Sequence, residues 1–130
     1  MNFKIDTKEK FQVICLLEEN LSVNMADDLK ELFERCRQAN TKNVIVNMAN
    51  VQQVSEATAE IIVKVQTEFY DAGHSFVLCS VQKPVEDNFE KAGYLELLNI
   101  TPTESEAWDI VQMEEIEREF LNDDTFQSDN

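Results

Sequence analysis

Glycine and proline are scarce in this chain of 130 residues, which has two of each. Folds built from many short strands use both residues in their tight turns, so the scarcity disfavours a β-rich fold. It also leaves no glycine-rich loop that could cradle phosphate groups. The P-loop and the dinucleotide-binding fingerprint are both absent, and a nucleotide site of either kind is excluded.

Positive charge is also in short supply. Lys and Arg number 11 against 26 Asp and Glu, which gives a formal net charge of −15. Nucleic acids and anionic membrane surfaces attract clustered Lys and Arg, so we expect neither as a direct partner. A protein with a basic surface is the natural electrostatic complement. The alternative is that the charge only confers solubility.

Cysteine and histidine are too few and too scattered to suggest a metal site. Cys15, Cys36 and Cys79 each lie in an apolar strand or helix pattern without a CxxC spacing, and we interpret them as buried free thiols. The only histidine, His74, follows a glycine at a turn and is interpreted as a solvated loop residue. No nucleophile–base pair is visible either. The sequence therefore predicts no cofactor and no enzymatic activity.

Long apolar runs are missing as well. None approaches the roughly 20 residues that span a bilayer. The chain starts directly on a strand pattern, without the charged and apolar regions of a secretory signal. We therefore expect a soluble, cytoplasmic protein, and the length fits one domain with its own core.

Strand and helix patterns alternate along the chain. Short-range alternation predicts a hairpin of two antiparallel strands, at 3–5 and 11–17. Further strands are predicted at 44–48, 76–81 and 97–100, and helices at 25–36, 56–70, 84–92 and 104–121. The order ββαβαβαβα predicts a single α/β domain with a mixed, mostly parallel sheet and right-handed crossovers.

Side chains at the helix starts and on the helix faces refine this scheme. Asn24, Ser55 and Thr103 are predicted to cap the helices that follow them. The apolar stripe predicted to bury the second helix consists of Ala57, Ile61, Ile62, Val65 and Phe69.

The last helix has an apolar stripe of its own, formed by Ile110, Met113, Ile116 and Phe120. Packing on its own domain is the default expectation for this stripe, and a homodimer or another partner on it is the alternative. Residues 122–130 are polar and acidic and are predicted to form a disordered tail, which places the domain at 1–121.

The stretch 44–65 indicates where a site would lie. It consists of a buried strand, a polar loop and an amphipathic helix, and α/β proteins bind their ligands at the carboxyl ends of such strands. The helix start also gathers unpaired backbone N–H groups that favour negative charge. In this chain that place holds Ser55, Glu56, Ala57 and Thr58.

Element order and several segments together resemble the STAS domain, the fold of bacterial anti-sigma factor antagonists. Residues 20–26 (NLSVNMA) stand where the family has a loop leading into its first helix, and 47–51 (NMANV) where it has Asp-Leu-Ser-Gly-Val. Residues 71–78 (DAGHSFVL) and 91–98 (KAGYLELL) resemble its Ala-Gly-Gly-apolar and Gly-Leu-acidic-apolar segments. The resemblance covers about residues 2–112, and the order and spacing of the segments make it specific.

The resemblance implies a non-enzymatic interaction module that binds an anti-sigma factor or a kinase-fold regulator. The implied partner-binding residues are Asn24, Ser55, Glu56, Ala57 and Thr58. Phosphorylatable members carry Asp-Ser-Ser-Gly at the start of the second helix, and the first Ser accepts the phosphate. Glu56 occupies that acceptor position here, which implies that no phospho-switch operates there.

The sequence alone leaves several alternatives open for the roles of these residues and of the domain. Glu56 is either a fixed negative charge or simply a favourable residue in a first helical turn. Ser55 and Thr58 carry hydroxyls that could serve as displaced acceptors. The domain could also be a STAS accessory subunit of a lipid-transport ABC complex.

Overall fold

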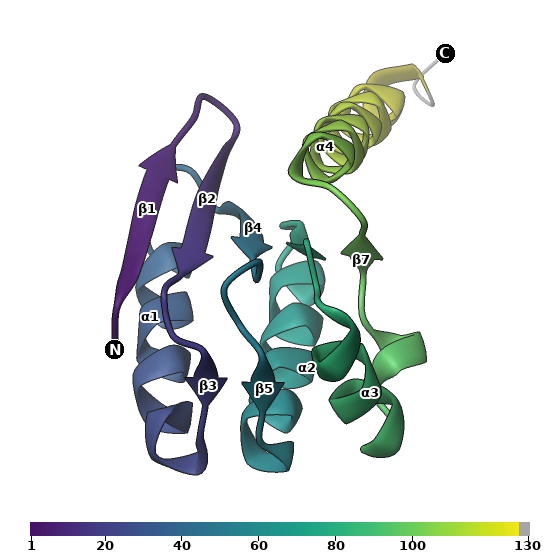
Figure 1. Cartoon of the computed structure of the whole chain (residues 1–130). Helices are drawn as coiled ribbons and strands as arrows, with labels where there is room; N and C mark the ends of the chain where they lie inside the picture. The colour runs from purple at the N-terminus through teal and green to yellow at the C-terminus, as the bar shows by residue number, and fades with distance from the viewer. Residues whose placement is uncertain (128–130) are drawn as a thin grey trace.

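The fold is built on a five-stranded sheet in the order β1-β2-β4-β6-β7 (Figure 1). The computed structural model describes residues 1–127, and side chains as far as residue 121. The strands are β1 (Phe3–Thr7), β2 (Phe11–Leu16), β4 (Asn43–Asn47), β6 (Phe76–Cys79) and β7 (Ile100–Thr101). β1 runs antiparallel to β2, and every other pairing in this sheet is parallel. The predicted mixed, mostly parallel α/β sheet is confirmed.

Helices cover the two faces of the sheet unequally. The helices are α1 (Ala26–Arg37), α2 (Glu56–Asp71), α3 (Lys83–Lys91) and α4 (Glu104–Gln127). Side chains of α1, α2 and α3 form the larger core against one face, whereas α4 covers the other face with a smaller cluster (Figure 1). Strand alternation separates the two cores: Val44 and Val46 belong to the larger one, and Ile45 to the smaller.

A network of aromatic rings lies at the centre of the larger core. Phe76 of β6 has no exposed surface, and its ring centroid lies 5.2 Å from that of Phe33 and 5.2 Å from that of Phe69. These rings connect the central sheet to α1 and α2, which lie side by side (Figure 1).

Small apolar side chains dock the first half of α4. Thr103 caps the helix as predicted, since its hydroxyl accepts a hydrogen bond from the backbone N–H of Glu106 at 3.2 Å. Ala107 and Val111 are fully buried against the sheet. The Trp108 ring packs edge-on against Phe11, with 5.0 Å between centroids.

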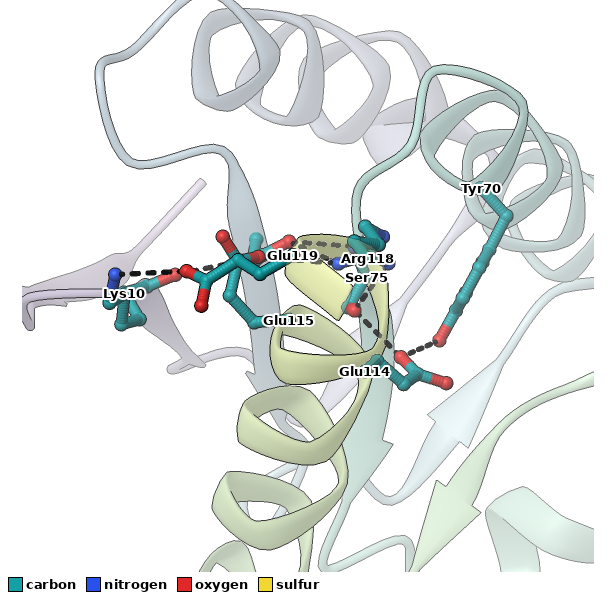
Figure 2. Close-up of polar contacts among 8 residues, drawn as sticks. Lys10, Tyr70, Ser75, Glu114, Glu115, Arg118 and Glu119 are labelled. Atoms are coloured by element: carbon teal, nitrogen blue, oxygen red, sulfur yellow. Dashed lines mark hydrogen bonds and ion pairs between the residues drawn. The ribbon is translucent and has the colours of Figure 1, made fainter. Parts of the chain in front are cut away.

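Polar side chains dock the middle of α4 (Figure 2). The Glu114 carboxylate accepts hydrogen bonds from the hydroxyls of Tyr70, at 2.8 Å, and Ser75, at 2.6 Å. Arg118 donates to the Ser75 hydroxyl at 2.8 Å and lies 3.3 Å from the Glu115 carboxylate. Buried polar groups are expected to be paired in this way, because an unpaired one loses its hydration without replacement.

Asn43, at the start of β4, extends this polar cluster into the sheet. Its side-chain amide donates to the backbone carbonyl of Lys10 at 2.8 Å and to the Glu115 carboxylate at 2.9 Å. Its carbonyl oxygen accepts the backbone N–H of Ser75 at 2.8 Å. One buried amide thus joins β4, the entry to β6 and α4.

We predict that Tyr70 makes the domain less stable in alkali. Burial, followed by the hydrogen bond and the charge of Glu114, raises the pKa of Tyr70 to about 12. An unfolded chain releases this proton near pH 10. Between about pH 10 and pH 12 the folded state therefore binds more protons than the unfolded state, and stability falls as the pH rises.

The matched test compares the native protein with Tyr70→Phe by urea denaturation at about pH 8 and about pH 11, on either side of the tyrosine's ordinary pKa. The native protein should lose more stability between the two pH values. Burial also raises the pKa of Cys36 and of Cys79 to about 11, but both proteins contain these thiols, so the difference isolates Tyr70. Equal losses would contradict the prediction.

The predicted packing of the α4 stripe on its own domain is confirmed for Ile110, which is half-buried and packs against the smaller core, and is wrong for the rest of the stripe. Met113, Ile116 and Phe120 are 60%, 62% and 62% exposed. The face turned to the sheet is instead the one that carries Ala107 and Val111, and it continues into the polar cluster. α4 also runs to Gln127, six residues beyond the predicted end at Leu121. The remainder of the predicted disordered tail, 128–130, lies outside the described residues.

Two predicted strand boundaries also need correction. β6 ends at Cys79 instead of residue 81, because Ser80 adopts a left-handed conformation with φ of 58°. The strand predicted at 97–100 is displaced to β7, and Leu95–Leu97 form a short 3-10 helix, η2. The side chain of Gln66 explains the shift, since it bonds the carbonyl of Leu97 at 2.7 Å and the N–H of Asn99 at 2.9 Å.

Candidate functional site

A small parallel sheet joins the two loops that carry the predicted site. It pairs β3 (Asn20–Leu21) with β5 (Gln53–Val54), and both strands lie just before helix starts (Figure 1). The backbone N–H of Ser55 also donates to the carbonyl of Leu21 at 3.0 Å. Neither strand could be predicted from the sequence, because a strand of two residues is too short to show an alternation of apolar and polar side chains. The only signal was an isolated apolar residue, Leu21 or Val54, just before each helix start.

Ser55 caps α2 as predicted. Its hydroxyl oxygen accepts a hydrogen bond from the backbone N–H of Thr58 at 3.1 Å, and its O–H group donates to the Thr58 hydroxyl oxygen at 2.9 Å. The Thr58 hydroxyl in turn donates to the backbone carbonyl of Ser22 at 3.1 Å. This chain of hydrogen bonds fixes the start of α2 against the loop that leads into α1.

Thr58 and Asn24 do not have the surroundings that the sequence predicted for them. Thr58 has no exposed surface, so its side chain packs beneath the helix start and is not presented to a partner. Asn24 is exposed but lies inside a short 3-10 helix, η1 (Val23–Met25). It does not cap α1: Met25 holds the cap position, and no side chain bonds there. The extra turn arises because the N–H of Met25 bonds the carbonyl of Ser22 at 3.0 Å.

Glu56 and Ala57 stand at the accessible side of the helix start. Glu56 is exposed in the first turn of α2, where the helix dipole favours a negative charge. Ala57 is half-buried and lines a groove of about 630 Å³ between α1 and α2.

The groove has an apolar floor and a charged rim. Its lining comes from two residues of α1 and eight of α2: Asp27, Lys30, Ala57, Glu60, Ile61, Val63, Lys64, Val65, Thr67 and Glu68. Of the stripe predicted to bury α2, Ile62, Val65 and Phe69 are buried as predicted. Ala57 and Ile61 are only half-buried and line this groove, and Ile61 also packs against the edge of the larger core. The buried face of the helix additionally includes Ala59 and two polar residues, Thr58 and Gln66, which the prediction lacked.

Asn88 of α3 is a residue of the site that sequence analysis did not identify. Its side-chain carbonyl accepts the backbone N–H of Val54 at 2.9 Å, which fastens β5 to α3. With Ser22, Gln53 and Ser55 it borders a cleft of about 290 Å³ next to the helix start. A single Asn on a helix face carries no sequence signal for this role.

The cysteines and acidic residues do not gather into a metal site. Among residues that the structure describes, no group of three or more His, Cys, Asp and Glu side chains could hold a metal ion. Cys36 and Cys79 are buried, and burial raises the pKa of both thiols to about 11, so they stay protonated near neutrality. The helix start itself presents the Ser55 cap, the exposed Glu56 carboxylate and the half-buried Ala57.

The sequence profile of the STAS domain matches residues 2–107. The chain belongs to the STAS domain family. This confirms the resemblance drawn from element order and segment spacing. Comparison with curated proteins found no match. None of the helices in the described part of this STAS domain is long and apolar enough to cross a membrane.

Solved structures of anti-sigma factor antagonists share the fold. A Thermotoga maritima protein, described as a candidate anti-sigma factor antagonist, is 20% identical with a TM-score of 0.72, covering 85% of this chain and 94% of that one. An anti-sigma factor antagonist (STAS) domain protein from Planctomyces limnophilus is 16% identical with a TM-score of 0.72, covering 85% and 97%. Unphosphorylated SpoIIAA is 17% identical with a TM-score of 0.68, covering 85% and 96%. At these identities the likeness concerns the fold.

Proposed function

We propose that this STAS domain is a non-enzymatic module that binds a regulatory protein of the anti-sigma factor or kinase-fold class. The binding surface is formed by the start of α2 around Glu56 and by the groove between α1 and α2. The observation that carries the proposal is this groove, because the half-buried side chains of Ala57 and Ile61 expose apolar surface between charged residues. Apolar centres with polar rims are the usual anatomy of protein interfaces.

The groove is complementary to a partner surface that carries both acidic and basic side chains. Lys30 and Lys64 stand on its rim together with Asp27, Glu60 and Glu68. The Lys64 ammonium already pairs with Glu60 at 3.3 Å on the exposed surface. Such surface pairs contribute little to stability, so they can be exchanged for pairs with a partner at small cost.

No phosphate cycle is expected at the helix start. Glu56 stands at the position of the family's acceptor Ser and has no hydroxyl. Thr58 is buried, and its hydroxyl is engaged with Ser22 and Ser55. Ser55 is half-buried, and its own hydroxyl oxygen holds the helix cap. A phosphate on either hydroxyl would have to break these bonds first.

Incubation with the cognate kinase-fold partner and ATP, followed by phosphosite mapping, tests this expectation. We predict no stoichiometric phosphate on Ser55 or Thr58. Nearly complete modification of either residue would show that the switch has moved by one or two positions. Partner binding would then be controlled by phosphorylation, and the expectation of no phosphate cycle at the helix start would be wrong.

Reversing the charge at Glu56 should weaken partner binding. We expect Glu56→Lys to raise the dissociation constant by about tenfold at low ionic strength and by less at physiological salt, where exposed charges are screened over about 8–10 Å. Titration calorimetry at two salt concentrations measures both values. Glu56 is exposed, so circular dichroism should show an unchanged fold.

Glu9→Lys is the matched control, because it makes the same charge change in the exposed turn between β1 and β2, at the opposite end of the sheet. It should leave affinity nearly unchanged. Equal effects of the two variants would assign the loss of affinity to net charge and not to this surface.

The partner itself can be identified by affinity purification from source cells. Recovery of an ABC ATPase in place of an anti-sigma factor or kinase-fold protein would replace this proposal with the accessory-subunit alternative.

A further inference from the structure

The outer face of α4 is apolar although it faces solvent. We define this outer face as Met113, Ile116, Phe120 and Leu121, which are 60–63% exposed. Their spacing places the first three on one side of the helix. The other exposed large apolar residues, Ile5, Leu17, Val23 and Leu97, belong to four separate segments. Isolated exposed apolar side chains are ordinary, but a contiguous set on one helix face indicates a binding surface.

The inner face of the same helix segment is polar and fully engaged. Glu114 and Arg118 both bond Ser75 (Figure 2). Glu115 accepts a hydrogen bond from Asn43. Rotating α4 to bury its apolar face would break all of these contacts. The helix is therefore held with its apolar side chains outward, and their exposure is a stable property of the fold.

Charge distinguishes between the proteins that could cover this face. Residues 104–121 contain seven acidic residues and one basic residue, Arg118. Arg118 is turned inward to Ser75 and Glu115. Asp109 and Glu117 lie four residues before and after Met113, on the same side of the helix, and both are exposed. Lys10, from the turn between β1 and β2, lies 3.6 Å from Glu119 and is already paired there. A second copy of this chain would bring Asp109 and Glu117 of both copies together with no basic residue on the outer face to offset them, and an anionic membrane would be repelled.

We propose that the outer face of α4 binds a basic amphipathic helix of a partner protein. Apolar side chains of that helix would pack between Met113, Ile116 and Phe120, and its Lys or Arg residues would pair with Asp109 and Glu117. The segment from Ile110 to Leu121 is about 18 Å long at 1.5 Å per residue, so about three turns of partner helix suffice. α4 lies on the opposite face of the sheet from α1 and α2. The two surfaces can therefore be occupied together, and this inference does not rest on the proposed function.

A photo-crosslinking amino acid in place of Phe120, in the full chain in source cells, tests the occupant directly. Mass spectrometry of the crosslinked peptide should yield a segment of another protein with net positive charge and apolar residues at helical spacing. The same amino acid in place of Leu97, which is 57% exposed and lies in η2 outside the candidate site, gives the background. Crosslinks to this chain itself, to an acidic segment, or at no more than background level would each overturn the proposal.

A purified system separates apolar recognition from simple attraction between opposite charges. The probe is an amphipathic Leu/Lys helix of about 18 residues, or five turns, compared with a scrambled peptide of equal composition. We expect the amphipathic peptide to bind more tightly than the scrambled one. The double variant Ile116→Ser and Phe120→Ser, which leaves the net charge unchanged, should weaken binding by about tenfold or more.

The control double variant, Ile5→Ser and Leu97→Ser, removes exposed apolar side chains of β1 and η2, away from α4 and from the candidate site, and should bind like the native chain. Equal binding of both peptides, or equal losses in both double variants, would overturn the proposal. Light scattering measures the oligomeric state of the native chain and of the double variant. A native dimer that becomes a monomer when Ile116 and Phe120 are substituted would overturn the proposal and assign the outer face to a second copy of this chain.

Discussion

Replacing Phe76 with alanine is expected to lower the free energy of unfolding by about 3–5 kcal/mol. The side chain is fully buried in the central part of the sheet and contacts the rings of Phe33 and Phe69. Alanine would leave a cavity there and remove both aromatic contacts. Because small domains are stable by only about 5–15 kcal/mol, this variant should approach the limit of folding. Guanidinium denaturation followed by circular dichroism measures the loss.

Phe120→Ala removes the same number of atoms from the outer face of α4, where the side chain is 62% exposed. It should change stability by no more than about 0.5 kcal/mol. Ile62→Ala, which truncates a buried aliphatic side chain of α2, should fall between the two, at about 2–5 kcal/mol. A Phe120 variant as unstable as the Phe76 variant would contradict the arrangement of the two faces of α4.

A chain that ends at Met113 is expected to melt at a clearly lower temperature than the full chain. The truncation removes Glu114 and Arg118, which are the partners of the buried Ser75 hydroxyl. It also removes the acceptor of the Tyr70 hydroxyl. Each buried polar group left without a partner costs about 1–3 kcal/mol. Differential scanning calorimetry measures the shift, and the pKa of Tyr70 should fall from about 12 toward its ordinary value in the same protein.

A chain that ends at Leu121 is the matched control, since it keeps the polar cluster of α4 and lacks only 122–130. Its melting temperature should equal that of the full chain. Glu114→Ala, in the full chain, should reproduce part of the loss and the change in the Tyr70 pKa. A chain ending at Met113 with an unchanged melting temperature would mean that the polar cluster adds nothing to the docking of α4.

Element order could be predicted because the strands and helices of the larger core carry strong periodic patterns. The buried strand at Val44–Val46 and the α2 start at Ser55 were both readable, the first from an unbroken apolar run and the second from cap preference. The family resemblance then placed these elements in the STAS fold, which the profile match confirms.

The orientation of α4 could not be predicted from the same kind of pattern. Periodicity shows that Met113, Ile116 and Phe120 share a face, but not which way that face points. The opposite face carries small and polar residues, and it is selected because Ala107 fits closely against the sheet and Glu114 finds buried hydroxyl donors. Those donors, Tyr70 and Ser75, are about 40 residues away in the sequence, so no local pattern reveals them.

At the candidate site, the sequence identified the place but not the role of every residue. Ser55 caps the helix as its type suggests, whereas Thr58 is buried because Ser22 offers a backbone carbonyl within reach. That carbonyl belongs to a loop 36 residues away. The assignment of Asn24, Ser55, Glu56 and Ala57 to partner contact stays a prediction.

The pairing of β3 with β5 makes the two loops of the candidate site one rigid unit. Loops that are free in solution lose conformational entropy when a partner orders them, and that loss reduces affinity. Here the backbone bonds between Leu21 and Ser55, and the Thr58 bond to Ser22, hold both loops in place before any partner arrives. Preorganisation of this kind favours fast association, and a substitution in either loop is transmitted to the other. The backbone of Glu56 is thus held at a fixed position, although its side chain is exposed.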